Sequence, residues 1–135
     1  MSPNGLEQIA TLSVPSDPAY LAVSRQALIG ATAGLPIGDE DLDDLKLVLS
    51  EICANAIVHA YGRQPNGRID VTFRRSSAEL EVTVADHGPG FPDARLPHQA
   101  GAGLTLLQRL CSRYAIDPRR AEGGSAVTFA HSIKS

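Results

Sequence analysis

The segment that decides both the fold class and the function reads Leu47-Val48-Leu49-Ser50-Glu51-Ile52-Cys53-Ala54-Asn55-Ala56-Ile57-Val58-His59. It is mostly apolar, yet it contains a carboxylate at Glu51, an amide at Asn55 and an imidazole at His59. Because these side chains are four residues apart, a helix places them on one face. Burial of an unpaired carboxylate is costly, so this face is either solvated or lines a polar cavity. Two interpretations stay open for the helix alone: a partly exposed stripe, or a general base beside a magnesium ligand.

The quoted segment belongs to a long predicted helix. We expect this helix to begin at Gly38 or Asp39 and to reach about Tyr61, because acidic residues at its start suit the positive end of the helix macrodipole. The acidic residues are Asp39, Glu40, Asp41, Asp43 and Asp44. The apolar stripe that would face the core consists of Leu42, Leu45, Leu49, Ile52 and Ala56.

On the N-terminal side of this helix, we expect a strand over Leu6 to Val14 and a first helix over Pro18 to Ala33. Asp17 can cap the free N–H groups at the start of that helix, and Pro18 has no N–H group to satisfy. The apolar residues that recur at helical spacing are Tyr20, Val23, Ala27 and Ala31.

On the C-terminal side, alternation with period two predicts a hairpin of two strands, Arg68 to Arg75 and Glu79 to Ala85, and a closing strand, Ala126 to Ile133. Asp86 to Ala100 contains three prolines and two glycines and is expected to be irregular, and Gly103 to Tyr114 is expected to form a third helix. This order predicts an α+β fold: a two-layer sandwich in which helices cover one face of a mixed, mainly antiparallel sheet.

The composition fits a single domain over residues 1–135, with 43% hydrophobic and 20% charged residues. The formal net charge of −3 provides no positive field for direct binding to nucleic acid. The sequence has no apolar run long enough for a membrane helix and no secretion signal, so we expect a cytoplasmic protein. Cys53 and Cys111 lie in apolar helical patterns and are expected to be reduced and structural.

Two glycine-containing segments add further signals. A predicted strand runs into Asp86-His87-Gly88-Pro89-Gly90-Phe91, whose glycines let the backbone approach a flat ligand; the alternative is an ordinary turn with an Asx hydrogen bond. Gly101-Ala102-Gly103 opens the third helix, where N–H groups and partial positive charge suit phosphate; the alternative is a simple joint between a loop and a helix. Each signal is weak by itself, and the combination is more specific.

In this order, the three signals resemble the histidine-kinase-like (Bergerat-type) ATPases, and within them the stand-alone anti-sigma-factor serine kinases of bacteria. The resemblance extends from Val14 to Phe129. Ser50 to Tyr61 resembles the N box of the family, Asp86 to Gly90 its first glycine box, and Gly101 to Gly103 its second.

The resemblance implies a site for ATP and Mg²⁺. In it, Glu51 would act as the general base, and Asn55 would bind the Mg²⁺ that bridges the nucleotide phosphates. Asp86 would accept a hydrogen bond from the adenine amino group, while Gly88 and Gly90 would let the base approach.

The resemblance also implies contacts with the rest of the nucleotide. Gly101 and Gly103 would lie against the phosphates, and residues 91–100 would form a lid over them. Gly124-Ser125 resembles the Gly-Thr pair of the family, so Ser125 would lie beside adenine and keep the hydroxyl group.

The implied function is an anti-sigma factor with ATP-dependent serine kinase activity. Such a protein would hold a sigma factor inactive and would phosphorylate a serine of a small antagonist protein, so that the antagonist could no longer displace the sigma factor. The partners would therefore be two proteins, with no direct contact to nucleic acid or membrane. By analogy, the first helix, with Arg25 and Gln26 toward solvent, is a candidate surface for a homodimer or a partner.

One departure from the family pattern keeps alternatives open. A basic residue often precedes the second glycine box, whereas this chain has His98, Gln99 and Ala100 there, with Arg95 or His98 as substitutes. A missing cation near the γ-phosphate would slow phosphoryl transfer. The first alternative is therefore a nucleotide-gated protein-binding regulator with little or no kinase activity. The others are a detached catalytic domain of a sensor histidine kinase and an α+β domain without a nucleotide site.

Overall fold

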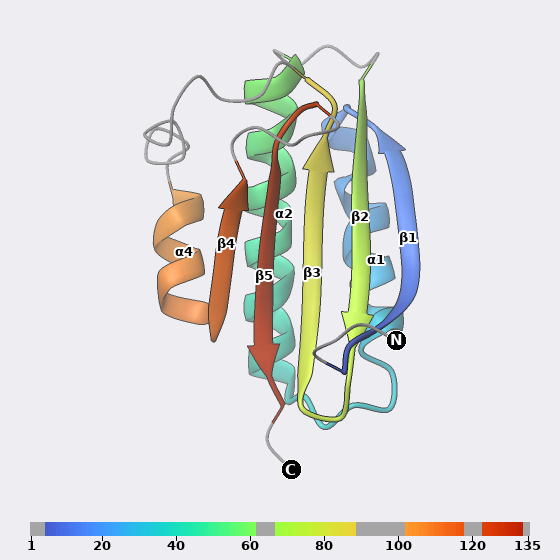
Figure 1. Ribbon diagram of the computed structural model, residues 1–135, viewed down its shortest axis with the longest axis vertical. Helices are drawn as coiled ribbons and strands as arrows, with labels where there is room; N and C mark the ends of the chain where they lie inside the picture. The colour runs from blue at the N-terminus through green and yellow to red at the C-terminus, as the bar shows by residue number, and fades with distance from the viewer. Residues whose placement is uncertain (1–4, 62–66, 89–101, 118–122, 134–135) are drawn as a thin grey trace.

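The protein folds into two layers, a five-stranded sheet and a layer of helices that covers one face of it (Figure 1). The computed structural model describes residues 5–61, 67–88, 102–117 and 123–133. In chain order, the elements are β1 (Glu7–Pro15), the 3-10 helix η1 (Pro18–Tyr20), α1 (Leu21–Ala31), α2 (Asp39–Tyr61), β2 (Arg68–Arg75), β3 (Glu79–Asp86), α4 (Ala102–Leu110), β4 (Arg113–Asp117) and β5 (Ala126–Ser132). The predicted two-layer α+β sandwich is confirmed.

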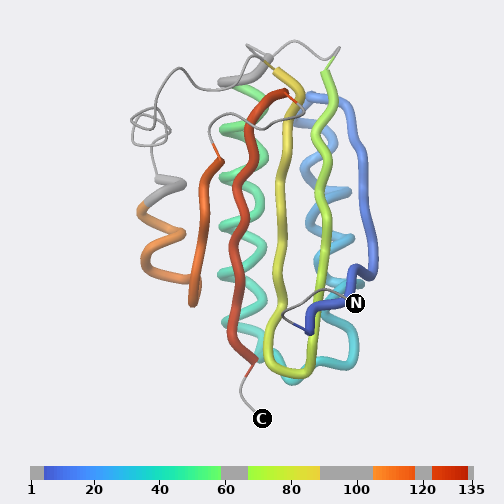
Figure 2. The backbone as a smooth tube through the Cα atoms, viewed as in Figure 1, coloured from blue at the N-terminus to red at the C-terminus, as the bar shows by residue number. Residues whose placement is uncertain are grey.

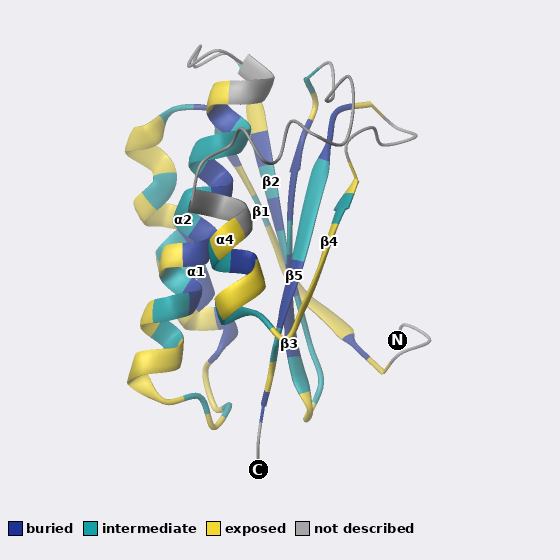
Figure 3. Cartoon of the chain, turned by 90° about the vertical axis from the view of Figure 1, so that its left-hand side faces the viewer, coloured by how far each residue is buried: buried dark blue, intermediate teal, exposed yellow. Residues whose placement is uncertain are grey.

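The strands lie in the order β1-β2-β3-β5-β4, and each neighbouring pair is antiparallel. Val71, Val84 and Val127 lie opposite one another on β2, β3 and β5 and belong to the side of the sheet that packs on the helices. Helices cover only this side of the described sheet, and the buried residues concentrate between the two layers (Figure 3). None of the described helices is long and apolar enough to cross a membrane.

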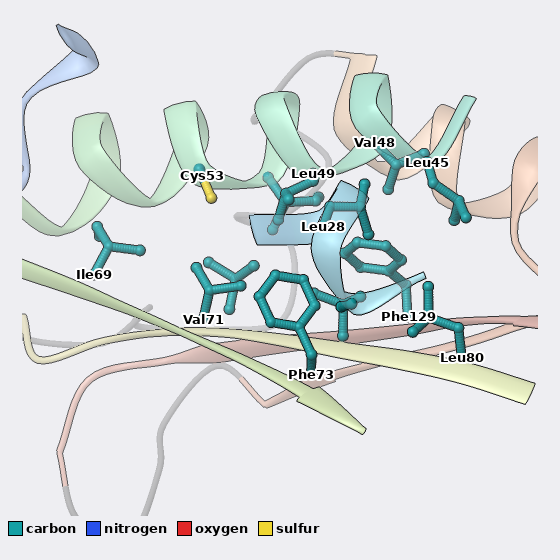
Figure 4. Packing of buried hydrophobic residues seen from close by; sticks show 14 of the residues in the cluster. Leu28, Leu45, Val48, Leu49, Cys53, Ile69, Val71, Phe73, Leu80 and Phe129 are labelled. Carbon is teal, nitrogen blue, oxygen red and sulfur yellow. The ribbon is translucent and has the colours of Figure 1, made fainter. Parts of the chain in front are cut away.

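The core forms where α2 lies on β2, β3 and β5 (Figure 4). Leu45, Leu49 and Ile52 of the predicted stripe are buried, and the rings of Phe73 and Phe129 are fully buried against them. Burial of each such side chain contributes roughly 1.5–3 kcal/mol to folding. The predicted apolar stripe of α2 therefore packs on the sheet and forms the centre of the core.

The start of the first helix is as predicted, but its buried face is only partly so. The Ala19 N–H group donates to Asp17 Oδ1 over 2.9 Å, and Pro18 opens the first turn. Tyr20 and Val23 are exposed, at 41% and 42%, whereas the buried residues of α1 are Ser24, Leu28 and Ala31. The predicted row is therefore right at Ala27, which packs against the core, and at Ala31, and wrong at Tyr20 and Val23, because apolar residues occur on several sides of this helix and the row that packs inward contains a serine.

The third helix ends earlier than the predicted Tyr114, and a strand takes its place. The Cys111 N–H group donates to the Leu107 carbonyl over 3.2 Å and closes the last turn of α4, while the Ser112 N–H group donates to the Ala130 carbonyl over 2.9 Å. Tyr114 falls one turn after Leu110, so its spacing imitates a helix, yet pairing with β5 makes it part of β4. The strand β4 is an edge of the sheet that the sequence did not predict.

Both cysteines have free thiols, as expected. Burial raises the pKa of the Cys53 thiol to about 12. Burial also raises the pKa of the Cys111 thiol to about 11. Because the reactive form of cysteine is the thiolate, both side chains remain protonated and unreactive near neutral pH.

Candidate functional site

The predicted site residues belong to elements that meet toward one end of the molecule. The strand β3 ends there and β5 begins there, as the backbone trace shows (Figure 2), and α2 ends there while α4 begins in the same half of the molecule (Figure 1). Residues that are far apart in the sequence are brought together by the antiparallel pairing of β3 with β5.

Asp86, the last residue of β3, has a buried carboxylate with defined hydrogen-bond donors. It is 3% exposed. Its Oδ1 accepts from the Gly88 N–H group over 3.0 Å and from the Ser125 N–H group over 3.2 Å, and its Oδ2 accepts from Ser125 Oγ over 2.6 Å. These donors satisfy a carboxylate that would otherwise be costly to bury. The carboxylate is therefore fixed in position as a hydrogen-bond acceptor, and Asp86, Gly88 and Ser125 form one hydrogen-bonded cluster.

Gly124 makes this cluster possible. Its φ is +80°, a backbone conformation that glycine adopts readily. A Cβ atom at this position would collide with the carbonyl oxygen of Asp86 and would lie 2.9 Å from Asp86 Oδ1. The local sequence marks Gly124 as the neighbour of Ser125 and gives no direct sign of its contact with Asp86. The glycine pair before the strand was the signal for a close approach of two backbone segments.

Glu51 and Asn55 lie on the flank of α2 that faces α4. Ser50 accepts a hydrogen bond from Arg25 of α1 over 3.3 Å, so the flank of α2 that contains Ser50 faces α1. The expectation that Arg25 points to solvent is therefore wrong, whereas Gln26 is exposed as expected. Glu51 and Asn55 lie on the other flank at helical spacing, and α4 packs against α2. Both side chains are half-buried. Of the polar row predicted from the sequence, Glu51 and Asn55 thus lie on the side of α2 where α4 packs.

The donor atoms of this region fit the predicted nucleotide and metal. A fixed carboxylate can accept a hydrogen bond from an amino group, and an amide oxygen is a ligand that Mg²⁺ accepts. The described residues contain no group of three or more His, Cys, Asp or Glu side chains that could hold a metal. A magnesium ion at Asn55 would therefore share its coordination with oxygen atoms of the ligand and of water, as is usual for this ion.

Other predicted site residues are placed only in part. Gly103 lies in the first turn of α4, at a helix N-terminus as expected. Gly90 and Gly101, together with the predicted lid and its His98, lie outside the described residues. The backbone of His59 is part of α2, and its side chain lies outside the description.

One contact beside Asp86 has no direct signal in the sequence. His87 Nε2 lies 2.7 Å from Asp70 Oδ2, which belongs to β2. Only the alternation of side chains along paired strands could have indicated that Asp70 and His87 lie on the same face of the sheet.

Comparisons with known proteins agree with this arrangement. The model of a family described as the histidine kinase-like ATPase domain matches residues 14–130. The serine-protein kinase RsbW of Bacillus velezensis is 36% identical over 134 residues, which cover 88% of this chain and 81% of that protein. The protein of the same name from Bacillus subtilis is 31% identical over the same shares. A third, from Listeria innocua, is 30% identical over 115 residues, which cover 74% of this chain and 73% of the relative.

Proposed function

The chain belongs to the histidine kinase-like ATPase domain family, and from this premise we propose that it is an anti-sigma factor with ATP-dependent serine kinase activity. The relatives that carry the name serine-protein kinase match most of its length. The three alternatives are not favoured: a regulator without catalysis, a histidine kinase domain and a domain without a nucleotide site.

The observation that carries the nucleotide part of the proposal is the buried carboxylate of Asp86. Its hydrogen bonds with Ser125 and Gly88 hold it at the end of β3, where we assign to it the recognition of the adenine amino group. We assign to Gly88 and Gly90 the close approach of the base. A buried polar acceptor gives specificity, because a base without the matching donor would leave it unpaired.

The phosphate end of the nucleotide would lie between α2 and the start of α4. We assign the phosphate contacts to Gly101 and Gly103, because N–H groups at a helix N-terminus attract anions. Asn55 would hold Mg²⁺, which supplies positive charge that neutralises the phosphates when bound.

In the proposed reaction, the bond between the γ-phosphorus and the bridging oxygen of ADP breaks, and a bond to a serine oxygen of the protein substrate forms. We assign to Glu51 the role of general base that takes the hydroxyl proton of that serine. Glu51 precedes Asn55 by one helical turn on the same flank of α2, so both side chains would serve one reacting centre.

The partners follow from the family resemblance. We propose that the chain binds a sigma factor and a small antagonist protein, and that phosphorylation of the antagonist prevents it from displacing the sigma factor. The proposed cytoplasmic location and the homodimer or partner surface on α1 are consistent with this role and stay predictions.

Transfer of label tests the proposal directly. The protein is incubated with γ-labelled ATP, Mg²⁺ and the candidate antagonist, and the chemical form of the labelled residue is determined. We expect acid-stable phosphoserine on the antagonist. Acid-labile phosphohistidine would point instead to a histidine kinase domain. Nucleotide binding without any transfer would support the nucleotide-gated regulator.

A thermal shift separates nucleotide binding from catalysis. A ligand that binds only the folded state stabilises it by about 2.7 kcal/mol at a hundred times its Kd. We therefore expect Mg-ADP at millimolar concentration to raise the melting temperature. The absence of any shift would contradict the nucleotide site itself.

A further inference from the structure

The end of β3 is held on both faces of the sheet. Asp86 points toward the helices, because it continues the buried row of β3 that contains Val82 and Val84. The next residue, His87, reaches the uncovered face, where its Nε2 atom lies 2.7 Å from Asp70 Oδ2 of β2. Asp86, the last residue of β3, and His87, the residue that follows the strand, are thus fixed by partners on opposite faces of the sheet.

His87 is also the central residue of the turn that fixes Asp86. The Gly88 N–H group donates to Asp86 Oδ1 over 3.0 Å, which closes an Asx turn over residues 86–88. The backbone torsions of His87 set the direction of the Gly88 N–H group relative to the carboxylate. A side chain that is tethered to the neighbouring strand restricts these torsions.

The pair is too exposed to act mainly through global stability. The side chain of His87 is 47% exposed and that of Asp70 is 31% exposed. Ion pairs with this exposure contribute little to the free energy of unfolding. Their effect should therefore be local, on the geometry of the turn that follows β3.

We infer that His87 is a positioning residue of the nucleotide site, acting through Asp70 on the face of the sheet opposite to the bound base. The inference rests on the proposed function and deepens it. The pair does not touch the nucleotide; it holds the Asp86 to Gly88 turn in the conformation that receives adenine. The turn is therefore preorganised by a contact that crosses from β3 to β2.

Four variants and one control test this role in the full-length protein. His87→Ala, Asp70→Ala and the double variant remove the pair, whereas His87→Gln keeps an N–H donor near the position of Nε2. The control is Arg74→Ala, which removes another ion pair between the same two strands, that of Arg74 Nη1 with Glu81 Oε1 at 3.3 Å, near the opposite end of β2.

The first readout is the Kd for Mg-ADP. We expect each alanine variant of the pair to weaken binding about three- to fivefold, and the double variant to weaken it by less than the sum of the two single effects, because the two side chains share an interaction. His87→Gln should bind like the parent protein, and so should Arg74→Ala. Equal weakening by Arg74→Ala would overturn the inference, because loss of any cross-strand pair would then have the same effect.

The second readout is amide hydrogen exchange at Gly88 without nucleotide. We expect faster exchange in His87→Ala and in Asp70→Ala, and no change in Arg74→Ala. If the parent protein binds Mg-ADP while all variants bind equally well and exchange at Gly88 is unchanged, the positioning role is overturned and the proposed function stands. If the parent protein fails to bind Mg-ADP, the proposed function fails, and the positioning role falls with it.

Discussion

The two ends of β3 contain acidic residues that are held in opposite ways. At the first end, Glu79 and Glu81 pair with arginines: Arg113 Nη2 lies 2.7 Å from Glu79 Oε1 and 2.7 Å from Glu81 Oε2. At the other end, the described donors to Asp86 are the neutral N–H and O–H groups of Ser125 and Gly88. Guanidinium groups tie the strands together through charge, whereas the N–H and O–H groups of Gly88 and Ser125 fix the position of the Asp86 carboxylate. The first arrangement serves the fold, and the second suits a binding site.

The arginine network depends on one small residue. Glu81, Ala130 and Arg113 lie opposite one another on β3, β5 and β4, so the guanidinium group of Arg113 reaches Glu81 across Ala130. Hydrogen bonds with Glu79 and then Glu81 raise the pKa of Arg113 above its usual value. A larger residue at Ala130 would separate these partners. The network thus fastens the edge strand β4 to the centre of the sheet.

The largest expected effect is the loss of transfer in Glu51→Ala. Removal of a general base costs about 10²- to 10⁴-fold in rate, while the binding of Mg-ADP should be preserved. The matched control is Asp44→Ala, which removes a carboxylate two turns earlier on the same side of α2. Rates of phosphoserine formation check the prediction. Loss of both binding and transfer in Glu51→Ala, with the fold intact by circular dichroism, would contradict the assignment of the base.

Asn55→Ala should abolish the part of nucleotide binding that depends on Mg²⁺. The amide oxygen is the proposed protein ligand of the ion, so removal should weaken Mg-ADP about 10- to 100-fold, the usual cost of disturbing a metal site. Isothermal titration calorimetry of ADP into the protein, once with Mg²⁺ and once with a chelator, checks this prediction. The control is Ala56→Ser, a small change at the neighbouring position. This variant should still bind ADP more tightly with Mg²⁺ than with the chelator. An Asn55→Ala protein that still responds to Mg²⁺ would place the ion elsewhere.

Gly124→Ala tests whether the Asp86 end depends on close backbone approach. Strain at the positive φ and the collision with the Asp86 carbonyl should lower the free energy of unfolding by about 2–3 kcal/mol and weaken nucleotide binding. Gly123→Ala is the control, because Gly123 also has a positive φ, +100°, yet an added Cβ would meet nothing within 4 Å. Urea unfolding of both variants gives the comparison. Equal losses would show that backbone conformation alone matters.

Arg113→Ala should have the smallest effect, and this effect should be on stability rather than on nucleotide binding. Its side chain is 42% exposed, so loss of the network should lower the free energy of unfolding by about 1 kcal/mol or less, without changing the Kd for Mg-ADP. High salt should reduce the difference from the parent protein, since screening weakens exposed pairs. A weakened affinity for Mg-ADP would show that the two ends of β3 are coupled. It would contradict the assignment of one end to the fold and of the other to the binding site.

The sequence predicted some elements well and others poorly for identifiable reasons. The sequence predicts α2 correctly because its acidic start, its length and its apolar row all indicate the same helix. The strand β4 is missing from the prediction because Tyr114 continues the helical spacing of α4, and the five residues of β4 become a strand only by pairing with β5. The buried row of α1 was only partly assigned correctly, because Ser24 occupies a core position and Val23 does not.

The same distinction holds for the site. The residue types and their order were readable: Glu51 and Asn55 at one helical turn, the segment from Asp86 to Gly88, and the serine at position 125. The contact of Asp86 with Ser125 was not readable from local pattern, because 39 residues separate them. The close approach of Gly124 to Asp86 and the tie between His87 and Asp70 likewise depend on strand pairing.

The sequence by itself determined the residue types of the site, the long middle helix and the family, because local spacing and chemical type are properties of neighbouring residues. Only the tertiary structure decided which flank of α2 faces α4, which donors hold the carboxylate of Asp86 and which partner His87 finds across the sheet. The first depends on how the helices pack, and the other two depend on the register between strands, which is fixed by packing of the whole core rather than by any single segment.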